Sequence, residues 1–465
     1  MNSLPPTPPE AWEPLLRFAR IAGRPLERFL RIEAASGILL LVMTAIALIW
    51  GNSPWADSYD QVWHTPIGVQ IGTFTFQRTA AWFVNDGLMV IFFFVVGIEI
   101  RREVSYGELS EWRRAALPMA AAIGGMLVPA GIYVAMAGAP LTRSGWGVPM
   151  ATDIAFAVGI LALLGKRVPA ALRVLLLTLA VIDDLGAILV IAIFYSSGIS
   201  GTGLLVASGG IGCVFIMQRV GVRTKLAYVF PALVVWAGTY ASGIHPTIAG
   251  VVVGLMTPVR AWLGPQGFLI DVRNELERLG KATLGKLTSR ELVGTLRHVE
   301  IAKREAISPA ESLIDTLHPW VAFGIMPLFA LANAGVSIWG AQFDSASFSV
   351  MSAVALGLLV GKPGGVLLIS ALVLRLKIAT CPAGIGYRHL TVLGVVAGVG
   401  FTMALFIAHL AFKDASLLAS AKLGILLASA IAAMLALLLG RVLLSPVPIT
   451  GAAESADEAE SSTEM

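Results

Sequence analysis

Two adjacent carboxylates, Asp183 and Asp184, lie inside an otherwise apolar run from Ala170 to Tyr195. Two acids this close disfavour joint ionisation, so their titrations should be coupled and the pair could hold either a proton or a small cation. Deprotonated carboxylates are hard oxygen ligands of the kind that hard cations prefer. Because neighbouring helix positions point about 100° apart, one carboxylate could line a cavity while the other meets an adjacent helix.

The elements that hold these acids must cross a lipid bilayer. The 465 residues are 57% hydrophobic and 13% charged, which is too apolar for a soluble domain of this size. A hydrocarbon core of about 30 Å needs about 20 apolar residues per helix, and about twelve segments qualify. The sequence therefore predicts an all-α polytopic membrane protein with segment centres near Ala45, Phe92, Ile123, Phe156, Leu185, Val206, Val234, Val251, Pro327, Leu359, Val399 and Ala430.

Three further residues could belong to the same site. Asp153, with Thr152 before it, and Lys362 also lie in apolar segments. An ionisable residue at membrane depth costs roughly 2.5 to 3.5 kcal/mol or more, so it usually faces a partner or a water-filled cavity. The alternative is a permanently buried structural pair neutralised by Lys362, which would leave Asp153 and Thr152 without a role.

Two segments are expected to be interrupted helices. Pro149 to Ala157 is polar at its middle, and an apolar run around residue 400 contains Gly398, Gly400 and Thr402. Paired interrupted helices are typical of inverted-repeat transporters with a site near the bilayer midplane. This pattern predicts repeats formed by helices 3 to 5 and 10 to 12, with breaks in helices 4 and 11 whose carbonyls and helix dipoles line the site.

Lys and Arg cluster in every second connection. With the N-terminus in the cytoplasm, 28 of the 33 fall on the inner side, as the positive-inside rule requires. Only Arg78, Arg143, Lys413 and Lys422 fall outside, and Lys362 lies within a segment. We therefore expect both termini to be cytoplasmic, and nucleic-acid binding has no support.

The chain divides into three predicted regions. Residues 1–32 should be a cytoplasmic N-terminal segment, 33–446 the transmembrane domain, and 447–465 an acidic disordered tail. Within the domain, 51–78 is expected to hold an external β-hairpin, although an ordinary capped loop fits the same residues; an exposed hairpin could join two copies as a homodimer. Residues 260–312 should form a long cytoplasmic loop with one or two amphipathic helices.

Seven motifs together resemble the bacterial NhaA sodium/proton antiporters over about residues 33 to 440. They are Asn85-Asp-Gly-Leu-Met89, Ala151-Thr-Asp-Ile-Ala-Phe-Ala157, Ile182-Asp-Asp-Leu-Gly-Ala187, Leu317-His-Pro-Trp320, Ala332-Asn-Ala-Gly335, Gly361-Lys-Pro-Gly364 and Gly400-Phe-Thr-Met403. The resemblance implies a twelve-helix secondary transporter of the bacterial inner membrane, not an enzyme and without a cofactor. It would exchange cytoplasmic Na⁺ or Li⁺ for external H⁺ electrogenically, by alternating access, for Na⁺ and pH homeostasis.

The resemblance also implies roles for individual residues. Asp183 and Asp184 would be the cation and proton site and would ligate the transported Na⁺, with Thr152 and Asp153 contributing from broken helix 4. Lys362 would pair with Asp183 when the cation is absent. Four residues match positions that the family associates with pH response: Glu99, Arg102, Glu103 and His245.

One departure from the family pattern concerns that pH response. Reference members carry an acidic residue followed by a histidine before the Leu317-His-Pro-Trp320 motif, whereas this chain has Ile314 and Asp315. We therefore expect a broader or shifted pH profile.

Other function classes fit these residues less well. An intramembrane aspartyl protease needs carboxylates from separate helices and a Gly-x-Gly-Asp signature, and a channel needs a continuous pore. An antiporter for K⁺ or another monovalent cation stays open, as does a regulated cation sensor, because selectivity depends on cavity size, which residue types do not fix. The implied partners are Na⁺, Li⁺, H⁺ and membrane lipids.

Overall fold

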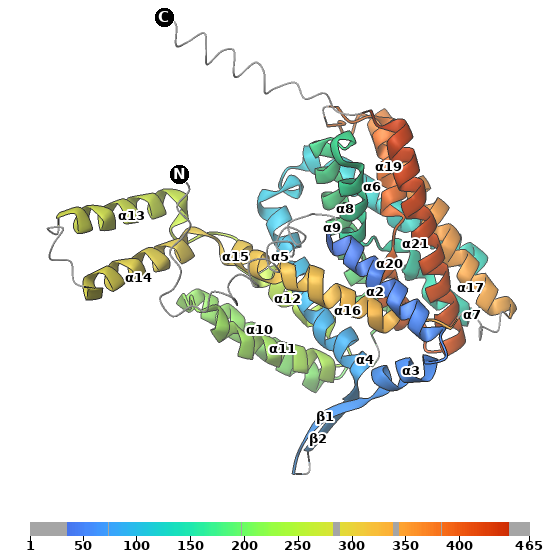
Figure 1. The fold of residues 1–465 in the computed structure, drawn as a ribbon, viewed down its shortest axis with the longest axis horizontal. Coiled ribbons are helices and arrows are strands. Elements are labelled where there is room, and N and C mark those ends of the chain that lie inside the picture. Colours follow the sequence, from blue (N-terminus) through green and yellow to red (C-terminus); the bar gives the residue numbers. More distant parts are fainter. Residues whose placement is uncertain are drawn as a thin grey trace, which may run out of the picture.

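The computed structural model describes residues 35–72, 74–196, 198–281, 289–337, 344–382 and 384–445. The predicted terminal regions 1–32 and 447–465 lie outside these residues. Figure 1 shows a bundle of helices with a β-hairpin at one end and a helical hairpin extending from its side.

Most of the described chain is helical. The first part consists of α2 (Ala35–Gly51), α3 (Ala56–His64), β1 (Pro66–Ile71), β2 (Phe74–Thr79), α4 (Ala80–Trp82), η1 (Phe83–Leu88), α5 (Met89–Tyr106), η2 (Glu108–Ser110), α6 (Trp112–Met136), α7 (Pro140–Arg143), η3 (Ser144–Met150), α8 (Ile154–Leu164), η4 (Gly165–Arg167), α9 (Ala170–Phe194), α10 (Gly201–Val220), η5 (Lys225–Tyr228), α11 (Val229–Ala241) and α12 (Thr247–Met256). The second part consists of α13 (Gly264–Lys281), α14 (Ser289–Ala306), α15 (Pro309–Trp320), η6 (Val321–Ile325), α16 (Met326–Asn333), α17 (Ser345–Leu356), η7 (Gly357–Gly361), α18 (Lys362–Arg375), α19 (Tyr387–Ala397), α20 (Phe401–Ala411) and α21 (Ala415–Leu443).

The prediction of a helical membrane protein is confirmed by the length and composition of these helices. Within the described residues, seven helices are long and apolar enough to cross a bilayer, or up to ten if each of three bent pairs counts as one span. Eleven of the predicted centres fall inside helical elements, and Val399 falls at a break between two of them. The count of twelve spans and the inverted repeats stay predictions.

Two of the bent pairs lie where the sequence predicts interrupted helices. The helical stretch Pro140–Met150 meets Ile154–Arg167 at an angle of 43°, and α19 meets α20 at 46°. The third pair, α2 and α3, bends by 113° and is not predicted from the sequence. Residues 151–153 and 398–400 are therefore non-helical backbone in the middle of apolar segments.

Strands β1 and β2 form an antiparallel hairpin with Pro66 opposite Thr79, so the hairpin ends one residue beyond the predicted stretch 51–78. Part of the same stretch forms helix α3, which the sequence analysis did not predict. Tyr59 and Trp63, one turn apart on α3, are both buried, so α3 packs one apolar side onto the bundle. The hairpin's position outside the membrane and its part in a homodimer stay predictions.

A π-helical turn, η7, directly precedes Lys362. A Cβ on Gly357 would lie 2.7 Å from Cβ of Pro149, and a Cβ on Gly361 would lie 2.7 Å from Cα of Pro129. The two glycines therefore let this turn pack closely against η3 and α6. A π-helical turn accommodates one residue more than the α-helical turn that it replaces, and such turns are frequent at functional sites.

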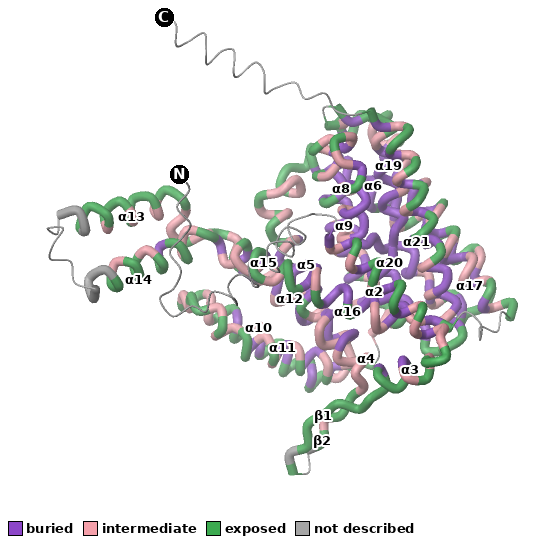
Figure 2. Tube along the Cα trace, viewed as in Figure 1, coloured by how far each residue is buried: buried purple, intermediate pink, exposed green. Residues whose placement is uncertain are grey.

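Burial divides the molecule into a densely packed bundle and a periphery with exposed apolar side chains. Figure 2 shows the buried residues gathered around α9, α19 and α20, whereas α10 and α11 are largely intermediate or exposed. Large apolar side chains such as Leu205 and Phe230 are 75% exposed. Exposed apolar surface of this extent suits contact with lipid chains rather than water.

The contact between α6 and α18 provides a test of this packing. A Cβ on Gly124 would lie 2.2 Å from the carbonyl oxygen of Gly365. We expect Gly124→Ala to destabilise the protein by about 1 to 3 kcal/mol through overpacking, measured as a lower melting temperature in detergent. Gly131→Ala is the matched control, because a Cβ there meets no atom within 4 Å. Equal melting temperatures for the two variants would contradict the close helix contact.

Candidate functional site

Helix α9 places both central acids near the middle of a 25-residue apolar helix. Asp183 and Asp184 are 1% and 0% exposed, respectively. Because they are neighbours on one helix, their side chains leave it in directions about 100° apart and meet different surroundings.

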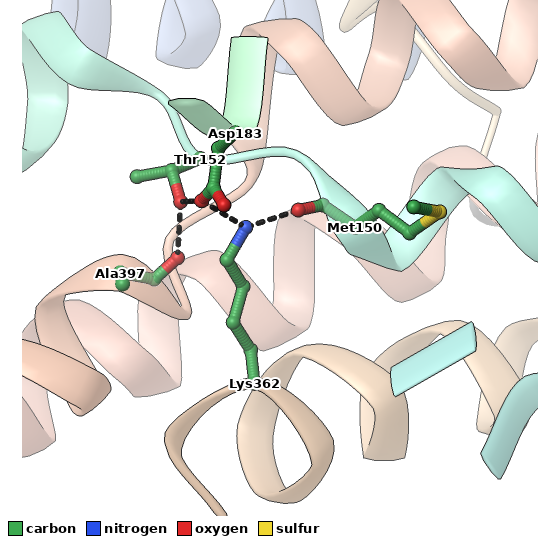
Figure 3. A network of polar contacts seen from close by, with 5 residues as sticks. All are labelled: Met150, Thr152, Asp183, Lys362 and Ala397. Carbon is green, nitrogen blue, oxygen red and sulfur yellow. Dashed lines mark hydrogen bonds and ion pairs between the residues drawn. The ribbon is translucent and has the colours of Figure 1, made fainter. Parts of the chain in front are cut away.

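Asp183 is the centre of a polar network drawn in Figure 3. Its Oδ2 lies 2.9 Å from Nζ of Lys362, which is also fully buried, and accepts a hydrogen bond of 2.7 Å from the hydroxyl of Thr152. The Lys362 ammonium also donates to the carbonyl oxygen of Met150, just before the first break. The predicted pairing of Lys362 with Asp183 is thus present in the structure as a buried ion pair.

Asp184 has a different environment. Among the described residues, neither of its carboxylate oxygens has a hydrogen-bond partner, and neither does Oδ1 of Asp183. Buried polar groups are nearly always hydrogen-bonded, and a buried charge is paired or binds a metal ion. Three buried carboxylate oxygens without a protein partner are therefore a donor set that either a proton or a hard cation can satisfy.

Asp153 caps two helices at once. Its Oδ1 accepts a hydrogen bond of 3.0 Å from the backbone N–H of Phe156 at the start of α8. Its Oδ2 accepts from the backbone N–H of Thr402, at 3.1 Å, and from the Thr402 hydroxyl at the start of α20. Both oxygens are thus committed to helix N-termini, where a carboxylate is stabilising. A direct role of Asp153 in cation binding stays a prediction.

The two breaks hold each other in place. The backbone N–H of Asp153 donates to the carbonyl oxygen of Val399 at 2.8 Å. A Cβ on Gly400 would lie 3.0 Å from the carbonyl oxygen of Ala151, and one on Gly398 would lie 2.7 Å from that of Leu358. The two predicted glycines therefore allow backbone segments to cross at close range beside the acids.

Comparison with known proteins gives the family. A family model described as Na⁺/H⁺ antiporter 1 matches residues 27–439. The Na⁺/H⁺ antiporter NhaA 2 of Myxococcus xanthus is 68% identical over 98% of this chain and 97% of its own length. Its counterpart in Sorangium cellulosum is 54% identical, covering 98% of each chain, and one from Pseudomonas putida KT2440 is 50% identical over 91% of this chain and 94% of its own.

The chain belongs to the NhaA family of Na⁺/H⁺ antiporters. The resemblance inferred from the seven motifs is thereby confirmed, and with its apolar helices the chain is a bacterial integral membrane protein.

Three of the four residues matched to the pH response of NhaA proteins lie near the C-terminus of α5, and the fourth, His245, lies just before α12. Glu103, near its C-terminus, accepts hydrogen bonds from the backbone of Glu108 at 2.9 Å and from Thr178 at 3.4 Å. Glu99 is partly buried one turn earlier, and Arg102 is exposed.

His245 is separated from that group. Its Nε2 lies 3.2 Å from Oδ1 of Asp86, and its Nδ1 lies 2.8 Å from the hydroxyl of Thr247. Since Asp86 precedes Glu99 by 13 residues, a rise of 1.5 Å per residue separates them by about 20 Å. The structure thus does not bring His245 together with Glu99, and the pH role of all four residues stays a prediction.

The departure from the NhaA pattern at residues 314 and 315 has a packing consequence. Ile314 is buried in a small apolar cluster with Ile98 and Ala310, whereas Asp315 is exposed. Ile98 directly precedes Glu99 in α5, so the apolar contact of Ile314 lies one residue from a position matched to the pH response. The altered pH profile stays a prediction.

Sequence reasoning missed one buried polar pair. Asn85 and Asn333 exchange amide hydrogen bonds of 2.7 and 3.3 Å between η1 and α16, and Asn333 also donates to the carbonyl oxygen of Phe329. Both asparagines belong to the seven motifs that resemble the NhaA family. A signal was therefore present, but nothing in the sequence showed that the two motifs meet.

The double cap by Asp153 predicts a graded effect of substitution. Asp153→Ala removes both caps and should destabilise the protein by about 1 to 4 kcal/mol, since each cap contributes about 0.5 to 2 kcal/mol. Asp153→Asn keeps one acceptor oxygen and should lose about half as much. Melting temperature in detergent is the measurement. Asp344→Ala removes the single cap of α17, where Asp344 accepts from the Ser347 backbone, and serves as the control. A loss for Asp153→Ala no larger than for this control would rule out the double cap.

Proposed function

We propose that this NhaA-family protein exchanges cytoplasmic Na⁺ or Li⁺ for external H⁺ at Asp183 and Asp184. The exchange is electrogenic, proceeds by alternating access and serves Na⁺ and pH homeostasis. The observation that carries the proposal is the fully buried carboxylate of Asp184, which has no partner among the described residues while its neighbour Asp183 is paired with Lys362. One acid is thus neutralised by the protein, and the other needs an ion from outside it.

The proton-loaded form follows from charge balance. In the geometry of Figure 3, Asp183 and Lys362 neutralise each other, so the region is neutral when Asp184 carries a proton. A neutral buried site avoids the large cost of an unpaired charge in a low-dielectric interior.

The cation-loaded form uses both acids. Asp184 gives up its proton, and the cation takes the carboxylate oxygens of Asp184 and Asp183 as hard ligands. The cation then competes with the Lys362 ammonium for Asp183, because both positive groups need the same carboxylate. Lys362 loses a proton in that step, so two protons leave for one cation and the exchange moves net charge.

The coupling of proton transport to cation transport depends on which of the two ions occupies the carboxylates. A proton and a cation cannot both fill the same carboxylate oxygens, so each must leave before the other binds. Without a proton or a cation, the ionised carboxylate of Asp184 is buried with no partner among the described residues, so this form reorients poorly between the two sides of the membrane. The mutual contacts of the two breaks support a site whose access changes when these segments move against each other.

Asp184→Asn should abolish exchange while the protein still folds and inserts, because an amide cannot alternate between a proton and a cation. The measurement is proton flux in proteoliposomes driven by Na⁺, Li⁺ or K⁺ across a range of pH. Asp57→Asn is the control, since that carboxylate is exposed at the start of α3, before the hairpin. Retained Na⁺-dependent flux in the Asp184 variant would contradict the site assignment, and flux driven equally by K⁺ would contradict the cation class.

Lys362→Ala should lower the free energy of unfolding by about 3 to 5 kcal/mol in the absence of Na⁺, because Asp183 would remain buried without its partner. Added Na⁺ should restore part of that stability, since the cation replaces the lost positive charge. Melting temperatures with and without Na⁺ test this, with Lys166→Ala in the exposed η4 turn as control. Unchanged stability together with an unchanged pH profile of transport would show that the pair has no role in exchange.

A further inference from the structure

A helical hairpin extends from the side of the bundle. It consists of α13 and α14 and is called the arm below. In Figure 1 the arm leaves the bundle near the end of α10 and runs across the direction of α21 instead of folding back over the other helices. None of its described residues belongs to the ion site, and its position away from the bundle calls for another role.

The root of the arm is fixed to the connection between α10 and α11. Arg223 of that connection forms an ion pair with Glu305 of α14, and its guanidinium lies 4.6 Å from the ring centroid of Trp262. The backbone N–H of Leu263 donates to the carbonyl oxygen of Glu305 at 3.0 Å, which ties the start of the arm to its end. The arm is thus held as a unit beside the end of a membrane helix.

The surroundings of this root are typical of a membrane–water interface. Helix α10 ends at Val220, which is largely exposed, and Leu226 of the following connection is exposed as well. Trp262 is also more than half exposed, and tryptophan is enriched at the level of the lipid headgroups. The arm therefore starts where the apolar surface of the bundle gives way to polar surface.

The two sides of the arm differ in polarity. Arg278 and His298 lie 2.9 and 3.6 Å from the carboxylate of Glu275, and all three line the cavity between the two helices. Leu276 and Leu296 each stand two residues earlier, about 200° around the same helix, and therefore point to the opposite side. They are 60% and 58% exposed. One side of the arm is thus polar, and the other presents exposed leucines from both helices.

The net charge of the arm and its flanking residues indicates what kind of surface covers the two leucines. Between residues 260 and 307, Lys and Arg outnumber Asp and Glu by nine to six, and Arg297, Lys303 and Arg304 are exposed on α14. Amphipathic helices with basic polar residues lie in the interface of anionic bilayers, with the apolar side at the boundary between headgroups and chains. We propose that the arm lies on the membrane surface and binds anionic phospholipids through Leu276, Leu296 and the nearby basic side chains.

Site-directed spin labelling of the full-length protein tests this proposal. Cys213 and Cys381 are first replaced by Ser, and labels are attached to Leu276→Cys and Leu296→Cys. Arg278→Cys and His298→Cys are matched controls, because these side chains are as exposed but lie on the other side of the arm. In nanodiscs of phosphatidylcholine with phosphatidylglycerol, the leucine labels should be several-fold less accessible to a water-soluble nickel complex than the controls and more accessible to oxygen. In phosphatidylcholine alone this difference should shrink.

Three outcomes would overturn the proposal. Equal nickel access for leucine and control labels in both lipids would show that the arm stands in water. Equal protection in both lipids would exclude a preference for anionic headgroups. Protection that persists in detergent, with magnetic coupling between labels on different chains, would show that a second copy covers the leucines instead.

Discussion

The cost of a charge in an apolar interior governs the arrangement of this protein. Asp183, Asp184 and Lys362 are fully buried within helices that are otherwise apolar, and an isolated charge there would be prohibitively unfavourable. The ion pair of Lys362 with Asp183 satisfies two of the three groups. The third, Asp184, has no hydrogen-bond partner among the described residues, and the proposed exchange rests on this group, because its charge would change with the ion bound.

The interrupted helices solve a second problem of the same kind. A break frees backbone N–H and C=O groups that lipid cannot hydrogen-bond, so these groups need partners from the protein. The carboxylate of Asp153 serves the starts of α8 and α20, and the backbone of each break bonds to the other. The buried helix ends therefore stabilise each other, and the same crossing places Thr152 against Asp183.

The sequence predicted the helical membrane fold, both breaks and the buried charged residues that the structure brings together, because membrane helices leave a strong hydropathy signal and few charges. It did not predict which groups touch. The caps that Asp153 provides for α8 and α20 were not predicted, since a residue type does not say which N–H groups it meets, and its role at the ion stays a prediction. The bend into α3, the asparagine pair of Asn85 and Asn333, and the separation of His245 from Glu99 all depend on how distant segments pack. A comparison of residue types alone could not reveal these three features.

The π turn before Lys362 makes the chemistry depend on chain length as well as residue type. Each residue added to or removed from a helix turns everything beyond it by about 100°. If η7 were an ordinary α-helical turn with one residue fewer, the side chain at the position of Lys362 would swing away from α9, although the motif around it would read the same. Two sequences with identical motifs can thus differ in whether a lysine reaches the acids, and a single deletion would separate Lys362 from Asp183 without changing either residue.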